Sequence, residues 1–224
     1  MAVSIIIPAL NEAGCLAGTL QSLRRQSPAE IIVVDGGSSD GTLAAAQGAD
    51  QILVAPPGRA AQMNAGAAKA CGDILLFLHA DCTLEDGAVA AVQRCLRVPN
   101  IAACCFHMHV TASGWAFRAI DSCATARVRL TGIVYGDQGL ALRRDDFVRL
   151  GGFPQLRFME DVMFSLRLRP EGKVVVLPQK VYVSPRRWQK VGLLRQTLRN
   201  WALTALAAAG VHPDALARFY ANVR

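Results

Sequence analysis

Short apolar runs recur along the first part of the chain, at residues 3–8, 30–35, 51–55 and 74–78. Runs this short and this continuously apolar are typical of strands that are buried on both faces, as in a parallel sheet. The segments between them have helical features, such as the spacing of Leu16, Leu20 and Leu23. The pattern therefore predicts alternating strands and helices over about the first 95 residues, with helices on both faces of a parallel sheet.

The rhythm changes after residue 100, where strands and helices no longer alternate regularly. No internal repeat or low-complexity tract interrupts the chain, so its 224 residues predict a single α/β domain. The elements expected in this part are a strand at 101–110, a helix at 113–130, a turn at 136–139, a strand at 140–142, a short helix from 145, a helix from 159, strands at 173–177 and 180–183, a helix at 191–209 and a last helix after 213.

Composition and charge narrow the classes of partner. The chain is 52% hydrophobic with a mean hydropathy of +0.27, yet no apolar run reaches the roughly 18 residues that span a bilayer. The net charge is +7, and basic residues are dense between 143 and 199, which favours an anionic partner. Few aromatic residues are interleaved with the basic ones, so we expect no nucleic-acid partner.

The seven cysteines are the next clue, because they form neither a C-x-x-C pair nor zinc-finger spacing with histidine. Their odd number and apolar neighbours indicate reduced, buried thiols. The first residues read as a buried strand and not as a secretion signal. Together these features predict a cytoplasmic protein.

Three carboxylates follow the predicted strands. Asp35 and Asp81 end two of them, and Glu12 lies just past the end of the first. Because parallel strands end at the same edge of a sheet, these groups should converge where α/β proteins bind ligands. The alternative for Asp81 is that it only caps a helix starting near Glu85. There is no G-x-G-x-x-G and no P-loop motif, which disfavours dinucleotide dehydrogenases and P-loop enzymes.

At these residues the chain resembles a family-2 glycosyltransferase of the GT-A fold, a mostly parallel α/β sheet flanked by helices, here with a helical C-terminal tail. The short form, with His-Ala-Asp where the family has Asp-x-Asp, resembles a bacterial subgroup. The matching segments are 4–12 (SIIIPALNE), 32–42 (IVVDGGSSDGT), 58–66 (GRAAQMNAG), 77–81 (FLHAD) and 160–161 (ED).

The resemblance implies a nucleotide-binding half over residues 1–98, an acceptor half over 99–190 and a helical tail over 191–224. It implies a nucleotide-sugar donor, UDP-linked, with Asp35 accepting a hydrogen bond from the uracil imide and Arg59 facing a phosphate or the base. The residues it assigns to nucleotide-sugar binding are Pro8, Leu10, Glu12, Asp35, Arg59, Asn64, His79, Ala80, Arg186, Arg187 and Trp188.

The resemblance also implies a metal and a base. Asp81 would bind Mn²⁺ or Mg²⁺ on the diphosphate. His79 stands where the family has another Asp; its imidazole would either ligate the metal, favouring Mn²⁺, or hydrogen-bond a sugar. Asp161, ahead of Glu160, would be the general base that takes the proton from an acceptor hydroxyl, and a single displacement inverts the sugar carbon. Without the resemblance, these two acids are simply favourable first-turn residues of a helix.

Other interpretations stay open. The run 186–188 either closes over a diphosphate or is a basic surface turn. A stripe of Leu194, Leu198, Trp201 and Ala205 either docks the tail on its own domain or contacts an anionic membrane, which keeps a lipid-linked acceptor and peripheral membrane contact as options. The alternative functions are a non-catalytic nucleotide-sugar-binding protein, a nucleotidyltransferase, and a membrane-surface interaction protein.

Overall fold

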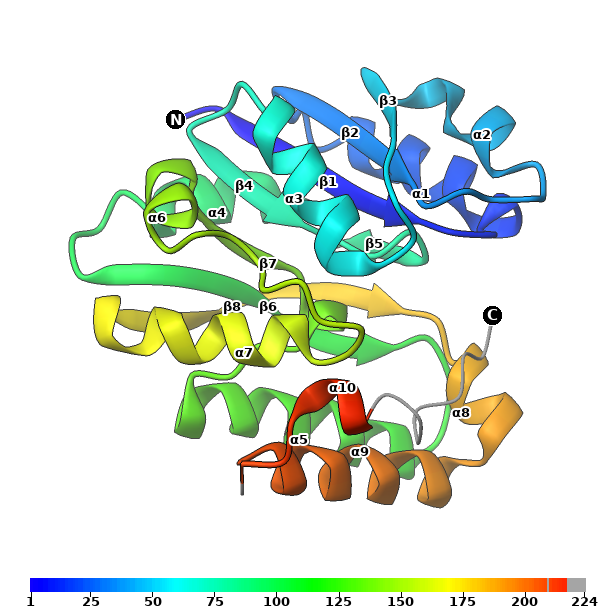
Figure 1. The fold of residues 1–224 in the computed structure, drawn as a ribbon, viewed down its shortest axis with the longest axis vertical. Helices are drawn as coiled ribbons and strands as arrows, with labels where there is room; N and C mark the ends of the chain where they lie inside the picture. The colour runs from blue at the N-terminus through cyan, green and yellow to red at the C-terminus, as the bar shows by residue number, and fades with distance from the viewer. Residues whose placement is uncertain (209, 217–224) are drawn as a thin grey trace.

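Eight strands form one curled sheet in the computed structural model, which describes residues 1–208 and 210–216 (Figure 1). Their order across the sheet is β3-β2-β1-β4-β7-β6-β8-β5. The strands are β1 (Val3–Ala9), β2 (Glu30–Asp35), β3 (Gln51–Val54), β4 (Ile74–Phe77), β5 (Cys82–Leu84), β6 (Ile101–Val110), β7 (Leu140–Arg143) and β8 (Lys173–Val183).

Helices lie on both sides of this sheet and along its lower part in Figure 1. Three short 3₁₀ turns join them: η1 (Ala46–Gly48), η2 (Gly136–Gln138) and η3 (Arg169–Glu171). The helices are α1 (Ala13–Arg24), α2 (Thr42–Ala45), α3 (Arg59–Lys69), α4 (Ala88–Cys95), α5 (Trp115–Thr131), α6 (Arg144–Arg149), α7 (Glu160–Leu168), α8 (Arg186–Val191), α9 (Leu193–Ala208) and α10 (Pro213–Leu216).

The first four strands confirm the predicted parallel sheet. β1 pairs in parallel with β2 and with β4, and β2 pairs in parallel with β3. Every residue of β1, β2 and β4 is buried, because helices cover both faces. One face packs against α1 and α4, and the other packs against α3, α6 and α7. This arrangement explains why these strands have continuous apolar runs and no alternation.

The second part of the chain completes the same sheet. β7 lies between β4 and β6 and is antiparallel to both, whereas β6 and β8 run parallel to each other. The β4–β7 pair therefore joins the first part of the chain to the second. No helix within residues 1–208 and 210–216 is long and apolar enough to cross a membrane.

One prediction of strand limits was wrong in this region. The segments 173–177 and 180–183 are one strand, β8, because a register shift opposite Phe106 and His107 absorbs Pro178 and Gln179 within a continuous pairing. The helix expected at 191–209 is α9, which begins at Leu193 after Gly192 (φ +92°), and the short helix α8 that precedes Gly192 was not predicted.

The capping expectation for Asp81 was also wrong. The residues after Asp81 form β5, which pairs with β8, and helix α4 begins only at Ala88 after Gly87. Helix α2 is one turn long and is preceded by Gly41, and Asp40 accepts a hydrogen bond from the Thr42 amide at 2.9 Å as a capping residue would.

Candidate active site

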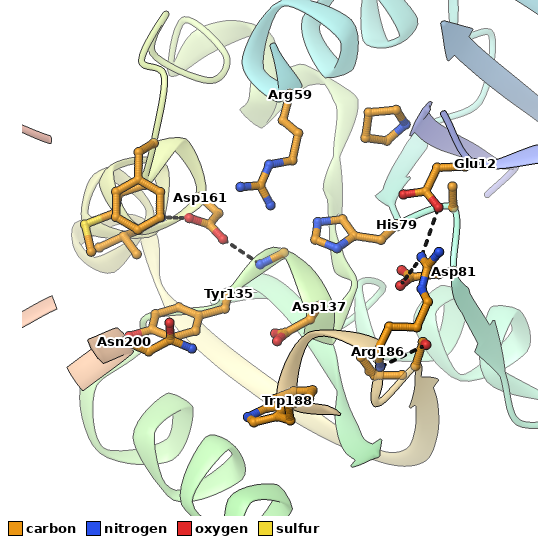
Figure 2. Close-up of a pocket in the computed structure, with 18 of the residues that line it drawn as sticks. Glu12, Arg59, His79, Asp81, Tyr135, Asp137, Asp161, Arg186, Trp188 and Asn200 are labelled. Atoms are coloured by element: carbon orange, nitrogen blue, oxygen red, sulfur yellow. Dashed lines mark hydrogen bonds and ion pairs between the residues drawn. The ribbon is translucent and has the colours of Figure 1, made fainter. Parts of the chain in front are cut away.

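A cavity of about 170 Å³ opens at the carboxyl edge of the parallel strands (Figure 2). In the view of Figure 2, Glu12, Asp81 and Arg186 lie at one end, Asp161, Tyr135 and Asn200 lie at the other, and His79 lies between them. The lining residues are Pro8, Asn11, Glu12, Arg59, His79, Ala80, Asp81, Tyr135, Gly136, Asp137, Phe158, Met159, Asp161, Val162, Val183, Ser184, Arg186, Trp188, Lys190, Asn200 and Thr204.

The first end of the cavity is organised by Arg186, the first residue of α8. One guanidinium nitrogen, Nη2, lies 2.9 Å from Glu12 Oε2 and 2.8 Å from Asp81 Oδ2 (Figure 2). Glu12 follows β1 and Asp81 follows β4, so the predicted convergence of these two carboxylates is confirmed. Arg186 balances one of their two negative charges.

The charged groups here influence one another. Burial raises the pKa of Asp81. The charge of His79 and the hydrogen bond from Arg186 lower this pKa by more than burial raises it, so it lies below its ordinary value. The same contacts raise the pKa of Arg186. Asp81 is therefore an ionised carboxylate at neutral pH, as a cation-binding group must be.

Three potential metal ligands lie together beside this pair. Donor atoms of His79, Asp81 and Cys82 lie within 4.8 Å of one another. Cys82 is fully buried, and that burial raises the pKa of its thiol well above the ordinary value. Because the thiolate is the form that ligates metals, Cys82 does not fit a hard cation. The carboxylate of Asp81 and the imidazole of His79 form an oxygen–nitrogen donor pair that fits Mn²⁺.

At the other end, Asp161 is held by two backbone amides. Gly136 N donates to its Oδ2 at 2.6 Å, and Val162 N donates to its Oδ1 at 2.8 Å. Asp161 is the second residue of α7, which follows the left-handed residue Met159 (φ +62°). Two fixed hydrogen bonds leave the carboxylate in one orientation, with its remaining lone pairs available in the cavity.

Gly136 connects the two central side chains. A Cβ atom at this position would lie 2.6 Å from His79 Nε2 and 3.4 Å from Asp161 Oδ2. The imidazole therefore packs where a side chain would otherwise be, while the amide of the same residue orients the Asp161 carboxylate. The sequence predicted a turn at residues 136–139 and gave no sign of this contact.

The neighbouring acid, Glu160, is placed differently. It is buried, and its Oε1 lies 3.1 Å from Arg59 Nε. Glu160 does not line the cavity, whereas Arg59 does. The predicted preference for Asp161 over Glu160 therefore has a geometric basis, and Arg59 is oriented by a buried carboxylate.

Three predicted donor-binding residues do not line this cavity. Asp35 is buried and accepts hydrogen bonds from the amides of Gly37 (2.8 Å) and Ser38 (2.9 Å), which form the loop after β2. Asn64 bonds twice to the backbone of Phe153, at 2.8 and 3.0 Å. The third is Leu10, a partly buried residue just after β1. Their contact with a nucleotide stays a prediction.

The basic-aromatic run is a short helix and not a surface turn. Trp188 is buried, lines the cavity and makes an edge contact with Phe117, with ring centroids 6.5 Å apart. Arg187 belongs to α8, but its side chain lies outside the described part of the structure, as do those of Leu194, Trp201 and Ala205. Leu198, from the same predicted stripe, is 60% exposed.

The cavity also contains residues that sequence reasoning missed. Asn200 and Thr204 of α9 line it, one helical turn apart, and Thr204 hydrogen-bonds to the Tyr135 hydroxyl. Phe158 and Met159 complete this side. The only sequence signal was the position of Phe158 and Met159 directly before the acidic pair. The predicted tail thus contributes to the cavity.

The sequence matches the model of the glycosyl transferase family 2 over residues 4–148, more than half of the chain. The chain therefore belongs to glycosyl transferase family 2, and its architecture is the GT-A fold of such enzymes. No curated protein gave a significant match to the sequence.

Solved structures support the fold. One is the mannosyltransferase PcManGT from Pyrobaculum calidifontis in complex with GDP-Man and Mn²⁺ (TM-score 0.63, 22% identity, 80% of this chain and 56% of that chain). Another is S. aureus TarS 1-349 in complex with UDP-GlcNAc (TM-score 0.66, 17% identity, 82% of this chain and 58% of that chain). A third is GalNAc-T7 with UDP, GalNAc and Mn²⁺ (TM-score 0.65, 18% identity, 82% of this chain and 44% of that chain). This chain thus spans about half of each of these longer chains.

Proposed function

We propose that this chain is an inverting, metal-assisted glycosyltransferase that moves a sugar from a nucleotide diphosphate sugar, UDP-linked, to an acceptor hydroxyl. The observation that carries the proposal is the shared cavity, in which an amide-anchored carboxylate, Asp161, lies opposite the charged group of Glu12, Asp81 and Arg186. Membership of glycosyl transferase family 2 supports the same reaction class.

The donor diphosphate would bind at the end containing Asp81 and Arg186. Arg186 and Lys190 lie one turn apart on α8, so both cations can serve phosphate oxygens. Asp81 and His79 would hold a divalent ion, for which the Mn²⁺ complexes of two similar folds are a precedent. When bound, such an ion supplies positive charge for the departing diphosphate. Pro8, Ala80 and Arg59 would contact the nucleotide and the sugar.

Asp161 would act on the acceptor. Its carboxylate takes the proton of the acceptor hydroxyl while that oxygen forms a bond to the anomeric carbon. The bond from this carbon to the diphosphate breaks on the opposite side, and its electron pair leaves with the nucleotide diphosphate. One displacement from the opposite side inverts the configuration at the carbon. Glu160 is less suited to this role because it pairs with Arg59.

The cavity draws on both predicted halves of the chain and on α9, so we extend the acceptor region, predicted as 99–190, to include Asn200 and Thr204. A reducing, cytoplasmic location is part of the same proposal. All seven cysteines lie in the described part of the chain and are free thiols, which suits such a compartment.

The first test is calorimetric titration of UDP, GDP and dTDP, each with and without Mn²⁺. Metal-dependent binding of UDP that Asp81→Ala abolishes is the expected result. The second test is turnover of the matching sugar nucleotide. Asp161→Asn should reduce it by about 100- to 10,000-fold, the usual contribution of a general base, while UDP binding persists. Asp145→Asn, the same change at an exposed residue of α6, is the control.

Two of the alternative functions predict distinct outcomes. Nucleotide binding without any turnover, unaffected by Asp161→Asn, would establish a non-catalytic binding protein. Release of pyrophosphate from a nucleoside triphosphate would establish a nucleotidyltransferase. Full turnover by Asp161→Asn would refute its role as the base.

A further inference from the structure

The cavity wall beside Asp161 is apolar. Phe158, Met159 and Val162 belong to a small buried cluster with Leu203 of α9, and Tyr135 packs against that cluster. All three wall residues are less than a tenth exposed, yet all three line the cavity. When the hydroxyl of a ligand reaches Asp161, the rest of that ligand would therefore contact the carbon, sulfur and aromatic ring atoms of this wall.

The polar groups at this end are largely engaged with one another. The Thr204 hydroxyl donates to the Asn200 carbonyl oxygen at 2.9 Å, so in its contact with Tyr135 the tyrosine is the donor. Both hydroxyl protons are therefore occupied inside the protein. Asn200 Oδ1 accepts from Gln196 at 2.9 Å, which leaves the Asn200 amide N–H groups without a partner among the described residues.

Arg127, a cation next to the Tyr135 ring, is also engaged. The guanidinium of Arg127 lies 3.3 Å from the centre of the Tyr135 ring and donates to Gln138 Oε1. Arg127 does not line the cavity. Arg127 is therefore not available to an anionic acceptor, which would also meet the negative charge of Asp161.

We propose that the acceptor is a neutral alcohol or phenol whose hydroxyl is attached to an apolar body, seated against Tyr135, Phe158, Met159 and Val162. The inference rests on the proposed function, because it takes Asp161 as the base for that hydroxyl. A free sugar would bring several hydroxyls to a wall whose polar groups are largely engaged, and each buried hydroxyl left without a partner is unfavourable. An apolar body instead gains from leaving water.

The test measures donor turnover with three probe acceptors: 2-naphthol, 1-hexanol and methyl glucoside. The protein is loaded with Mn²⁺ and the sugar nucleotide, and products are identified by mass spectrometry. We expect 2-naphthol or 1-hexanol to raise nucleotide release at least tenfold over hydrolysis by water and to yield the glycoside; which of the two does so separates aryl from alkyl acceptors. Turnover that methyl glucoside stimulates as strongly would overturn the inference.

Failure of the inference and failure of the proposed function give different results. Donor hydrolysis that no apolar alcohol stimulates would overturn the acceptor class and leave the transferase proposal intact. Absence of both donor binding and hydrolysis would overturn both.

A matched pair of variants tests the wall itself. Val162→Thr nearly keeps the shape of the side chain but adds a hydroxyl to the wall, so the ratio of turnover with 2-naphthol to turnover with methyl glucoside should fall about tenfold. Val148→Thr, at a residue of α6 that is 69% exposed, should leave this ratio unchanged. An unchanged ratio in Val162→Thr would count against the apolar seat.

Discussion

Replacing Gly136 by alanine should disturb His79 or Asp161, although alanine suits the backbone dihedral angles at this position. Gly136 is not among the glycines with positive φ, so alanine suits its backbone conformation. The added carbon, however, would lie 2.6 Å from His79 Nε2 and 3.2 Å from its Cε1. The first distance is about 0.9 Å shorter than the ~3.5 Å at which such atoms pack favourably.

Something must therefore move, and either movement harms the site. If the His79 ring shifts, it leaves the donor pair that it forms with Asp81. If the peptide shifts, the 2.6 Å hydrogen bond to Asp161 lengthens. A displacement approaching 1 Å at a reacting group lowers rates by up to about 100-fold, so we expect donor turnover to fall by about 10- to 100-fold, equivalent to ~1.4–2.8 kcal/mol in the activation barrier.

The assay combines donor turnover with calorimetric titration of UDP. UDP affinity should fall by less than turnover does, since Gly136 takes no part in the ion pairs of Arg186 with Glu12 and Asp81. Gly18→Ala is the control, because a Cβ there meets nothing within 4 Å and lies on α1. Normal turnover in Gly136→Ala would refute the reasoning. The reasoning would also be refuted if Gly136→Ala lowered turnover by the same factor in a protein that already carries His79→Ala, where the ring is absent.

Three further outcomes follow from other contacts. Arg186→Ala should raise the affinity for Mn²⁺ in the absence of nucleotide by up to about fivefold, because it frees Asp81 from a partly exposed ion pair. The same variant should weaken UDP binding, and calorimetry measures both affinities. Asn64→Ala should lower the free energy of unfolding by ~1–3 kcal/mol, since it breaks both bonds to Phe153, and should leave UDP affinity unchanged. Glu30→Gln should lower the melting temperature at pH 7, and the difference should shrink as the pH is lowered to 3, as thermal denaturation across this range would record.

The sign of the last prediction follows from the pKa of Glu30. Burial raises this pKa, but hydrogen bonds from Ser4, the Cys71 amide and Gln51 lower it below its ordinary value. The ionised side chain therefore stabilises the fold above the unfolded pKa of about 4.3, and this contribution is lost as the pH falls through the lower folded pKa. A difference in melting temperature that does not shrink between pH 7 and pH 3 would contradict this linkage.

The predictions for Arg186→Ala and Asn64→Ala can each be contradicted by one result. Mn²⁺ affinity that is unchanged in Arg186→Ala would mean that the ion pair does not compete with the metal. Loss of UDP binding in a folded Asn64→Ala protein would support the original expectation that Asn64 contacts the nucleotide, over the structural role that its bonds to Phe153 indicate.

The strands were predictable where burial on both faces dictated their composition. β2 has the predicted limits, and β1 and β4 differ from the prediction by one residue each. β8 was divided in the prediction because Pro178 normally ends pairing, whereas here a register shift accommodates it. α8 was missed because six residues are too few to show helical periodicity.

The site was predictable only in part, for a related reason. Glu12, Asp81 and Asp161 follow strand ends or begin a helix, positions that local sequence reveals. The contributions of Asn200 and Thr204 depend on where α9 docks, which is set by tertiary contacts with the cluster around Phe158 and Leu203. Likewise, the space that Gly136 leaves for His79 exists only once β4 and β7 are paired.

The position of β5 has a consequence for how the protein is made. Residues 78–81, which carry His79 and Asp81, run from the end of β4 to the start of β5, and β5 pairs only with β8, about 100 residues later in the chain. At a synthesis rate of about 5–20 residues per second, a ribosome needs roughly 5–20 s to bridge that interval. Until β8 emerges, β5 lacks its partner strand and Arg186 has not yet been made. A nascent chain can therefore form its first parallel strands early, but its ligand site is assembled only after residue 186 has been made.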